Sequence, residues 1–246
     1  MVNRIHRWFA VVLSLVLLTS CSATQSSANL EQQVLDIIRA NPDIVLEAVQ
    51  SYQAEQQAAA QSETLAQYEV ALQGIAADPT SEIGQSPTKG SEELQYVLYE
   101  FSDFECPFCG RSQPVISEFL ENHPEVTLVY KHFPLAQIHP QAIPAAQASW
   151  AAQQQGKFWE YHDALFANQG RLGDDYYVEL ASALHLNRAK FERDRQSAAD
   201  AIRRDLELGE AIGLNGTPFF TLNGVPLPGA VPVEALETAL EQAKNA

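Results

Sequence analysis

Basic residues are scarce in this chain. It carries 15 lysine and arginine residues against 31 aspartate and glutamate residues, which gives a formal net charge of −16. Such a chain would repel a polyanionic phosphate backbone, and no cluster of lysine or arginine offsets the repulsion. The composition therefore excludes nucleic acid as an expected partner.

Long hydrophobic runs are also lacking. The apolar run at residues 8–18 spans eleven residues, whereas a membrane-spanning helix needs roughly 20. A run of this length after a basic start is typical of the core of a signal peptide. We therefore expect a signal peptide over residues 1–20.

The apolar run ends in Leu18-Thr19-Ser20-Cys21, which resembles a bacterial lipobox. The alternative is an ordinary cleaved signal with an incidental cysteine nearby. We expect Cys21 to be the lipid attachment site. The acyl chains would then hold the mature protein on the extracytoplasmic, periplasmic face of a bacterial membrane.

Cysteine is scarce too, with three in the chain. If Cys21 is lipidated, Cys106 and Cys109 are the remaining thiols, in a compartment where disulfides form and persist. A disulfide between them would close a ring of four residues, and so short a loop gives little entropic stabilisation. A zinc site would need histidine partners at a spacing that the sequence does not offer, so no metal is expected. The pair is best explained as a reactive dithiol, with a structural disulfide and a metal site as the alternatives.

The first third of the chain is predicted to be helical and then irregular. We expect a polar tether over 21–29, a helical segment over 30–76, and a linker over 77–93 that is rich in Pro, Gly, Ser and Thr. Within the helical segment, Asn41-Pro42 is typical of a helix start. The later part of the segment has few large apolar residues. It is therefore predicted to be either a solvated stalk or one strand of an oligomer.

Strands and helices alternate after the linker. Aromatic and β-branched residues predict strands over 94–101 and 126–133, with a helix between them. A helical block is expected over about 140–214, and a hairpin with an Asn-Gly turn over 218–229 precedes a final amphipathic helix. The order β-α-β, helical block, β-β-α predicts an α/β domain over residues 94–246.

The position of Cys106 at a strand-to-helix junction favours a reactive thiolate. Pro107 fits the first position of the helix, and the unpaired N–H groups at a helix N-terminus stabilise an anion. A nucleophilic thiolate needs its pKa lowered from about 8.5. Cys109 lies one turn further along, directed inward, and is expected to resolve the mixed disulfide that Cys106 forms.

Three stretches resemble the DsbA-like family of thiol-disulfide oxidoreductases, which have the thioredoxin fold. They are FSDFECPFC (101–109), FWEYHDALFANQ (158–169) and GTPFF (216–220). Together with the element order, the resemblance covers about residues 80–245. It implies an α/β thioredoxin fold with an inserted helical domain, preceded by an N-terminal helical segment. It also implies catalysis by a dithiol without a cofactor.

The resemblance implies further residues of the site. Pro218 is expected to be the cis-proline that faces the dithiol and offers its backbone to a client peptide, with Thr217 close to Cys106. Pro107 and Phe108, between the two cysteines, are expected to contact the client as well.

Several ionisable residues lie near these motifs. The resemblance implies that Glu100 is buried beneath Cys109 and exchanges a proton with it, the alternative being a partly solvated glutamate at the end of a strand. Asp103 and Glu105 are expected to be solvated loop acids. Disulfide exchange requires no basic side chain, so three histidines are expected to have a structural role or to lie at the surface: His132, His139 and His162.

These features predict an extracytoplasmic thiol-disulfide oxidoreductase. Its partners would be cysteine-containing client proteins, and a membrane redox partner or a small-molecule oxidant would restore its disulfide. Phe108 stands where the most oxidising family members carry histidine and cannot donate a hydrogen bond to the thiolate, so an intermediate redox potential is expected. One alternative is a disulfide isomerase or reductase that forms a homo-oligomer through residues 30–73. The other is a non-catalytic peptide-binding chaperone.

Overall fold

The computed structural model describes residues 22–246, so the expected signal peptide and Cys21 lie outside the described residues. The chain divides into two compact units, Met1–Ser62 and Glu63–Ala246. Among the described residues, no helix is both long and apolar enough to cross a bilayer.

The described part of the first unit is helical. Helix α2 extends over Ser22–Ala40 and helix α3 over Pro42–Ala71, whose last turns belong to the second unit. Helix α2 therefore covers residues 22–29, within the range 21–29 where the sequence predicts a tether. The residues of this range are polar, but they include no glycine or proline that would stop the helix from extending.

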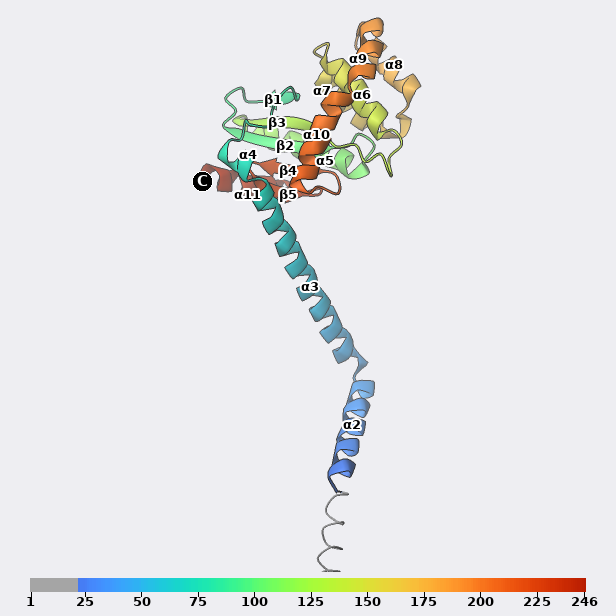
Figure 1. Ribbon diagram of the computed structural model, residues 1–246, viewed down its shortest axis with the longest axis vertical. Coiled ribbons are helices and arrows are strands. Elements are labelled where there is room, and N and C mark those ends of the chain that lie inside the picture. The colour runs from blue at the N-terminus through green and yellow to red at the C-terminus, as the bar shows by residue number, and fades with distance from the viewer. Residues whose placement is uncertain (1–21) are drawn as a thin grey trace, which may run out of the picture. The chain divides into compact units, whose positions relative to one another are not determined.

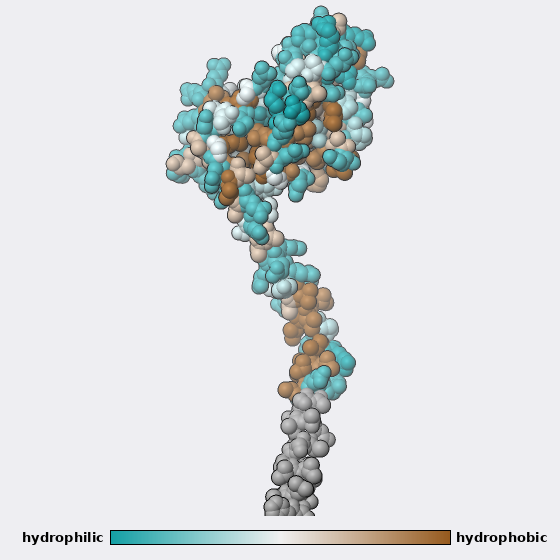
Figure 2. Space-filling view, viewed as in Figure 1, coloured by the Kyte–Doolittle hydropathy of each residue, from teal (hydrophilic) through white to brown (hydrophobic). Residues whose placement is uncertain are grey.

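Large apolar side chains are exposed along the helices of the first unit. Figure 2 shows them as brown patches on α2 and on the first half of α3. Ten such residues have exposed fractions between 39% and 63%. We call them the apolar segment: Leu30, Val34, Leu35, Ile37, Ile38, Ile44, Val45, Leu46, Val49 and Tyr52.

The second unit is built on a five-stranded sheet with the strand order β1-β3-β2-β4-β5 (Figure 1). The strands β2 and β3 are parallel, and the other neighbouring pairs are antiparallel. The strand bounds are Thr88–Gly90 for β1, Tyr96–Ser102 for β2, Val126–His132 for β3, Phe219–Leu222 for β4 and Val225–Pro228 for β5.

Strand β1 lies within the expected linker 77–93. It has three residues, all exposed, and its hydrogen-bonded partner is β3. A strand of three residues is too short for its sequence to show the alternation of apolar and polar residues that predicts a strand. Pairing with the edge of the sheet, which only the tertiary structure provides, makes this stretch a strand.

The two faces of the sheet carry alternate residues of β2. Leu98 packs beneath α5 (Pro107–Asn122) and α11 (Val233–Lys244). Tyr99 and Phe101 point to the opposite face, where the end of α3 and the short helix α4 (Gln73–Ala77) cover them. This alternation places Glu100 on the same face as Leu98, toward α5.

Five helices and one short 3₁₀ helix form the insertion between β3 and β4. Their buried core is aromatic and includes Phe158, Tyr161, Tyr177 and Phe191. The elements are α6 (Ala142–Gln153), α7 (Phe158–Ala167), η1 (Gln169–Arg171), α8 (Asp174–Ala183), α9 (Arg188–Ser197) and α10 (Ala199–Ile212). The predicted fold class, a thioredoxin fold with inserted helices after an N-terminal helical segment, is confirmed.

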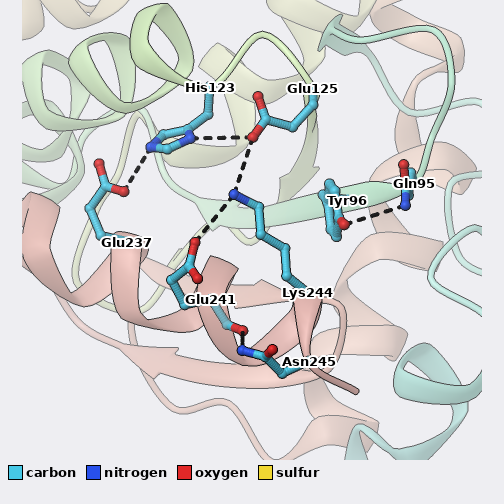
Figure 3. Close-up of polar contacts among 8 residues, drawn as sticks. All are labelled: Gln95, Tyr96, His123, Glu125, Glu237, Glu241, Lys244 and Asn245. Atoms are coloured by element: carbon cyan, nitrogen blue, oxygen red, sulfur yellow. Dashed lines mark hydrogen bonds and ion pairs between the residues drawn. The ribbon is translucent and has the colours of Figure 1, made fainter.

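A polar network joins α11 to the segment between α5 and β3 (Figure 3). His123 Nε2 lies 2.7 Å from Glu237 Oε2, and His123 Nδ1 lies 3.4 Å from Glu125 Oε1. Lys244 Nζ lies 3.4 Å from Glu125 Oε1 and 3.3 Å from Glu241 Oε1. The network holds the C-terminal helix over the apolar face on which α5 also packs.

Candidate active site

Cys106 and Cys109 lie where β2 gives way to α5. Cys106 is the N-cap residue of the helix, with φ −70° and ψ 121°, and Pro107 occupies the first turn. Both cysteines are free thiols. Cys106 is 3% exposed and Cys109 is fully buried, so Cys106 is the more accessible residue of the two.

The two thiols have opposite acidities. A hydrogen bond from the Cys109 thiol is the main cause that lowers the pKa of Cys106 to about 5 from a usual value of 9.0. The Thr217 side chain and backbone N–H groups of the first helical turn lower it further, while burial opposes the shift. Burial is also the main cause that raises the pKa of Cys109 far above its usual value, and Cys106 adds to the rise. Cys106 is therefore the thiolate at neutral pH.

The segment before β4 faces the dithiol. The Thr217–Pro218 peptide bond is cis. In the thiol form, Cys106 Sγ donates to the Thr217 carbonyl oxygen over 3.4 Å. The tertiary structure thus brings residues 217 and 218 next to Cys106, more than a hundred residues away in sequence.

Glu100 lies fully buried on β2. Its Oε1 accepts a hydrogen bond from Gln113 Nε2 over 2.9 Å, and its Oε2 is buried with no protein partner. Burial raises the pKa of Glu100 to about 7, against the effect of Ser102 and Gln113. Gln113 also donates to the Cys109 carbonyl oxygen over 3.4 Å, so it joins the acid to the turn that carries the second thiol.

The prediction that Asp103 is a solvated acid is wrong. Its side chain is fully buried. Asp103 Oδ1 accepts from the Glu105 N–H, and Oδ2 accepts from the Leu135 N–H over 2.9 Å and contacts His139 Nδ1 at 2.7 Å. Buried backbone N–H groups need acceptors, and this carboxylate supplies them for two loops. Glu105 is also not simply solvated, because its carboxylate accepts from the Gln141 N–H.

The residues between the cysteines face outward. Phe108 is 52% exposed, and the guanidinium carbon of Arg111 lies 4.3 Å from the centre of its ring. Pro107 is exposed as well. The ring of Phe108 thus presents an apolar surface next to Cys106, with a cation stacked on it.

The three histidines named above do not contact the dithiol. His132 and His162 are buried, and burial is the main cause that lowers the pKa of both. They pack around the stacked rings of Phe104 and Tyr130. Residues 22–246 contain no group of three or more His, Cys, Asp or Glu side chains that could hold a metal ion.

Two glutamine residues of the site are not found by sequence reasoning. Gln113 lies four residues after Cys109 on α5, a spacing that places both on one side of the helix. Gln169 belongs to the insertion, and its Nε2 donates to carbonyl oxygens of the loop that precedes α5. The helical spacing could have suggested Gln113, but no local signal connects Gln169 with this loop.

Comparisons with known proteins agree with this geometry. A family model described as thioredoxin matches residues 82–242. A thioredoxin-like oxidoreductase from Silicibacter pomeroyi DSS-3 has a similar structure, with a TM-score of 0.62 and 29% identity, over 66% of this chain and 94% of that one. The thiol-disulfide exchange protein alpha-DsbA2 from Wolbachia pipientis has a TM-score of 0.63 and 18% identity, over 72% of this chain and 97% of that one.

The chain is also similar in sequence to part of a membrane transporter. The Na(+)/H(+) antiporter NhaA 3 of Salinispora tropica is 37% identical over 158 residues, which are 63% of this chain. The chain thus spans about a quarter, 24%, of the length of that relative. Three quarters of the antiporter have no counterpart in the match, so its transport activity is not carried over to this chain.

Proposed function

The chain belongs to the thioredoxin family and has the fold of the DsbA-like oxidoreductases, and from this premise we propose that it is an extracytoplasmic enzyme that exchanges disulfides with client proteins. The opposite acidities of its two cysteines carry the proposal. A low pKa makes Cys106 a thiolate and a good leaving group, and a high pKa makes Cys109 a thiol once it is released.

The reaction starts from the oxidised Cys106–Cys109 pair. A client thiolate attacks Cys106 Sγ, so that a client–Cys106 disulfide forms, the bond to Cys109 breaks, and Cys109 leaves with the electron pair and takes up a proton. A second client thiolate then attacks the client sulfur of the mixed disulfide and displaces the Cys106 thiolate. The client is oxidised by two electrons and the enzyme becomes the dithiol. A membrane redox partner or a small-molecule disulfide restores the enzyme by the reverse exchange.

The surroundings of the dithiol support roles for the other residues. Glu100 is the group that exchanges a proton with Cys109, because its pKa of about 7 lets it be either protonated or ionised at neutral pH. Thr217 and Pro218 offer backbone atoms to an extended client segment. Pro107 and Phe108 contact the client on the other side of Cys106.

The test is oxidative folding of a reduced, cysteine-containing protein by the wild type and by a Cys106→Ser, Cys109→Ser double variant. The wild type should restore native disulfides and the double variant should not. Equal activity of the two would refute the enzyme and leave the peptide-binding chaperone as the better interpretation.

A lipid anchor at Cys21 follows from the sequence motif and places the reaction at the membrane surface. In a bacterial host supplied with radiolabelled palmitate, the full chain should become labelled and a Cys21→Ala variant should not. If both chains remained unlabelled, the anchor would be excluded while the exchange chemistry stayed unaffected.

A second candidate function is an oligomeric disulfide isomerase or reductase. The apolar segment favours it, because exposed apolar patches of this kind mark interaction sites. Phe108 favours it too, since it donates no hydrogen bond that would stabilise the reduced form. Equilibration with glutathione distinguishes the candidates: a potential near about −120 mV indicates an oxidase, and one near about −270 mV indicates a reductase.

A further inference from the structure

Gln169 joins the helical insertion to the active-site loop. It is the first residue of η1, which follows α7. Its Nε2 donates to the Phe104 carbonyl oxygen over 2.9 Å and to the Cys106 carbonyl oxygen over 2.9 Å. A side-chain amide has two N–H donors, so both hydrogens of Gln169 are used on this loop.

The second of these bonds acts on the backbone of the nucleophile itself. The Cys106 carbonyl oxygen also accepts the Gly110 N–H over 3.2 Å, as the first bond of the helix. Gln169 therefore adds a second donor to this carbonyl oxygen, which belongs to the same residue as the thiolate. A partial positive charge there offsets the negative end of the carbonyl dipole, which would otherwise oppose ionisation of Cys106.

Gly110 leaves the space that Gln169 occupies. A Cβ atom at residue 110 would lie 2.5 Å from Gln169 Oε1 and 3.0 Å from its Cδ. Gly110 is not among the glycines with positive φ, so its backbone does not require glycine. A glycine inside a helix costs about 0.5–1 kcal/mol relative to alanine. A side chain at residue 110 would therefore have to push the Gln169 amide aside.

We propose that Gln169 is a positioning residue of the exchange reaction, through which the helical insertion sets the orientation and the acidity of Cys106. Gly110 is its matching surface on α5. The inference rests on the proposed function, because it assigns a role in the same reaction.

The experiment compares Gln169→Ala, Gln169→Glu, Gly110→Ala and the Gly110→Ala, Gln169→Ala double variant with the wild type. The thiolate absorbance of the reduced full chain is titrated with pH, and the rate of its reaction with glutathione disulfide is measured at pH 5. Gln169→Ala should raise the midpoint by about half a pH unit, which lowers the thiolate fraction at pH 5 about twofold. Gln169→Glu should raise it more, because a carboxylate cannot donate and also places a negative charge near the thiolate.

Gly110→Ala tests the contact from the other side. Alanine favours the helix, but its methyl group displaces the Gln169 amide, so the midpoint should rise as in Gln169→Ala. In the double variant the amide is already gone, and the midpoint should equal that of Gln169→Ala alone. Additive shifts would overturn the proposal, because they would mean that the two residues act independently.

Two matched control variants test whether the shift of the midpoint is specific to Gln169 and Gly110. One removes a hydrogen bond elsewhere in the insertion, and the other adds a methyl group to a glycine elsewhere in the chain. Gln153→Ala removes another bond from the insertion to a loop carbonyl, that of Gln85. Gly74→Ala adds a methyl group to a helical glycine with no heavy atom within 4 Å. Both should keep the wild-type midpoint. If Gln169→Ala also keeps it while the wild type reacts normally, the inference fails and the proposed function stands. If the wild type itself does not react with glutathione disulfide, the proposed function fails first.

Discussion

Two residues separate Cys106 from Cys109, and less than one turn of helix decides how their thiols differ. Cys106 caps α5, where backbone N–H groups and the Cys109 thiol are available to a negative charge. Cys109 lies inside the first turns and faces the buried side of the helix, where water cannot solvate a thiolate. Glu100 is the third ionisable group of this site, and burial gives it a raised pKa as well.

Replacement of Cys109 by alanine should raise the pKa of Cys106. The Cys109 thiol is the largest single cause of the lowered value, and alanine removes that donor. The midpoint of the thiolate absorbance should move from about 5 toward the usual value of 9.0. Cys109→Ser keeps a hydroxyl donor and should move it less. An equal midpoint in Cys109→Ala and the wild type would show that the Cys109 thiol does not set the acidity of Cys106.

Replacement of Glu100 by glutamine should stabilise the protein at high pH. The folded protein disfavours ionised Glu100, so the group lowers the free energy of unfolding progressively as the pH rises from about 4.5 to about 7. The glutamine variant lacks this loss, which amounts to about 3 kcal/mol above pH 7. Urea unfolding of the wild type and of the variant at pH 4.5 and pH 8 measures this difference in the free energy of unfolding.

The same variant should slow exchange about tenfold at neutral pH, because glutamine cannot transfer a proton to or from Cys109. Glu93→Gln, at an exposed glutamate, is the matched control and should change neither property. A Glu100→Gln variant with the wild-type rate would remove Glu100 from the reaction while leaving its effect on stability.

At the scale of elements, the site is assembled from four segments that β2 and α5 bring together. The loop after β2 carries Asp103, and the loop after β3 supplies Leu135 and His139 to its carboxylate. The strand β4 begins directly after the Thr217–Pro218 bond, and the insertion contributes Gln169. Pairing of β2 with both β3 and β4 sets the distances among these loops.

Replacement of Asp103 by asparagine should destabilise the protein. Asp103 Oδ2 serves both the Leu135 N–H and His139, and an amide nitrogen at that place accepts from neither. The free energy of unfolding should fall by about 2 to 4 kcal/mol, the cost of two buried hydrogen bonds to a charged group. Chemical denaturation at pH 7 measures the change.

Asp175→Asn, at an exposed aspartate in the first turn of α8, is the control and should change the unfolding free energy by less than about 0.5 kcal/mol. If Asp103→Asn were equally mild, the carboxylate would not be what holds the two loops together.

At the scale of the whole molecule, the two units differ in what they bury. The second unit encloses its apolar residues in cores on both faces of the sheet and within the insertion. Among the described residues, nothing buries the apolar segment of the first unit in this way, although it also consists of large apolar side chains. The dithiol belongs to the second unit, so self-association through the first unit need not involve the reacting atoms.

A variant with Ile37→Gln and Ile44→Gln should lower the mass in solution if the apolar segment joins copies of the chain. Glutamine keeps the helix propensity but removes the apolar contact. Light scattering should show an oligomer for the wild type and a smaller species for the variant, with the same rate of reaction with glutathione disulfide. Val70→Gln, at a 65% exposed position in the last turns of α3, should keep the wild-type mass. A monomeric wild type would contradict the oligomeric candidate.

The order of elements and the dithiol could be predicted because local patterns encode them. Alternating strands and helices, the Cys-Pro-Phe-Cys pair and the Thr-Pro before β4 are all short-range features of the sequence. The resemblance to the DsbA-like family, stated on these motifs, is confirmed by the thioredoxin family model and by the fold of the solved structures. Strand β1 and the start of α2 were not predicted in this way, since neither has a distinctive local pattern.

The sequence by itself determined which residues are proposed to carry the chemistry: two thiols on one turn of a helix, an acid six residues before the first, and a proline after a threonine far downstream. The tertiary structure alone decided how these residues act. It buries Asp103 as an acceptor for two loops, raises the pKa of Glu100 by enclosing it, and sets Gln169 against Gly110. Burial and contacts between distant segments produce these effects, and neither is encoded within a few residues of the chain.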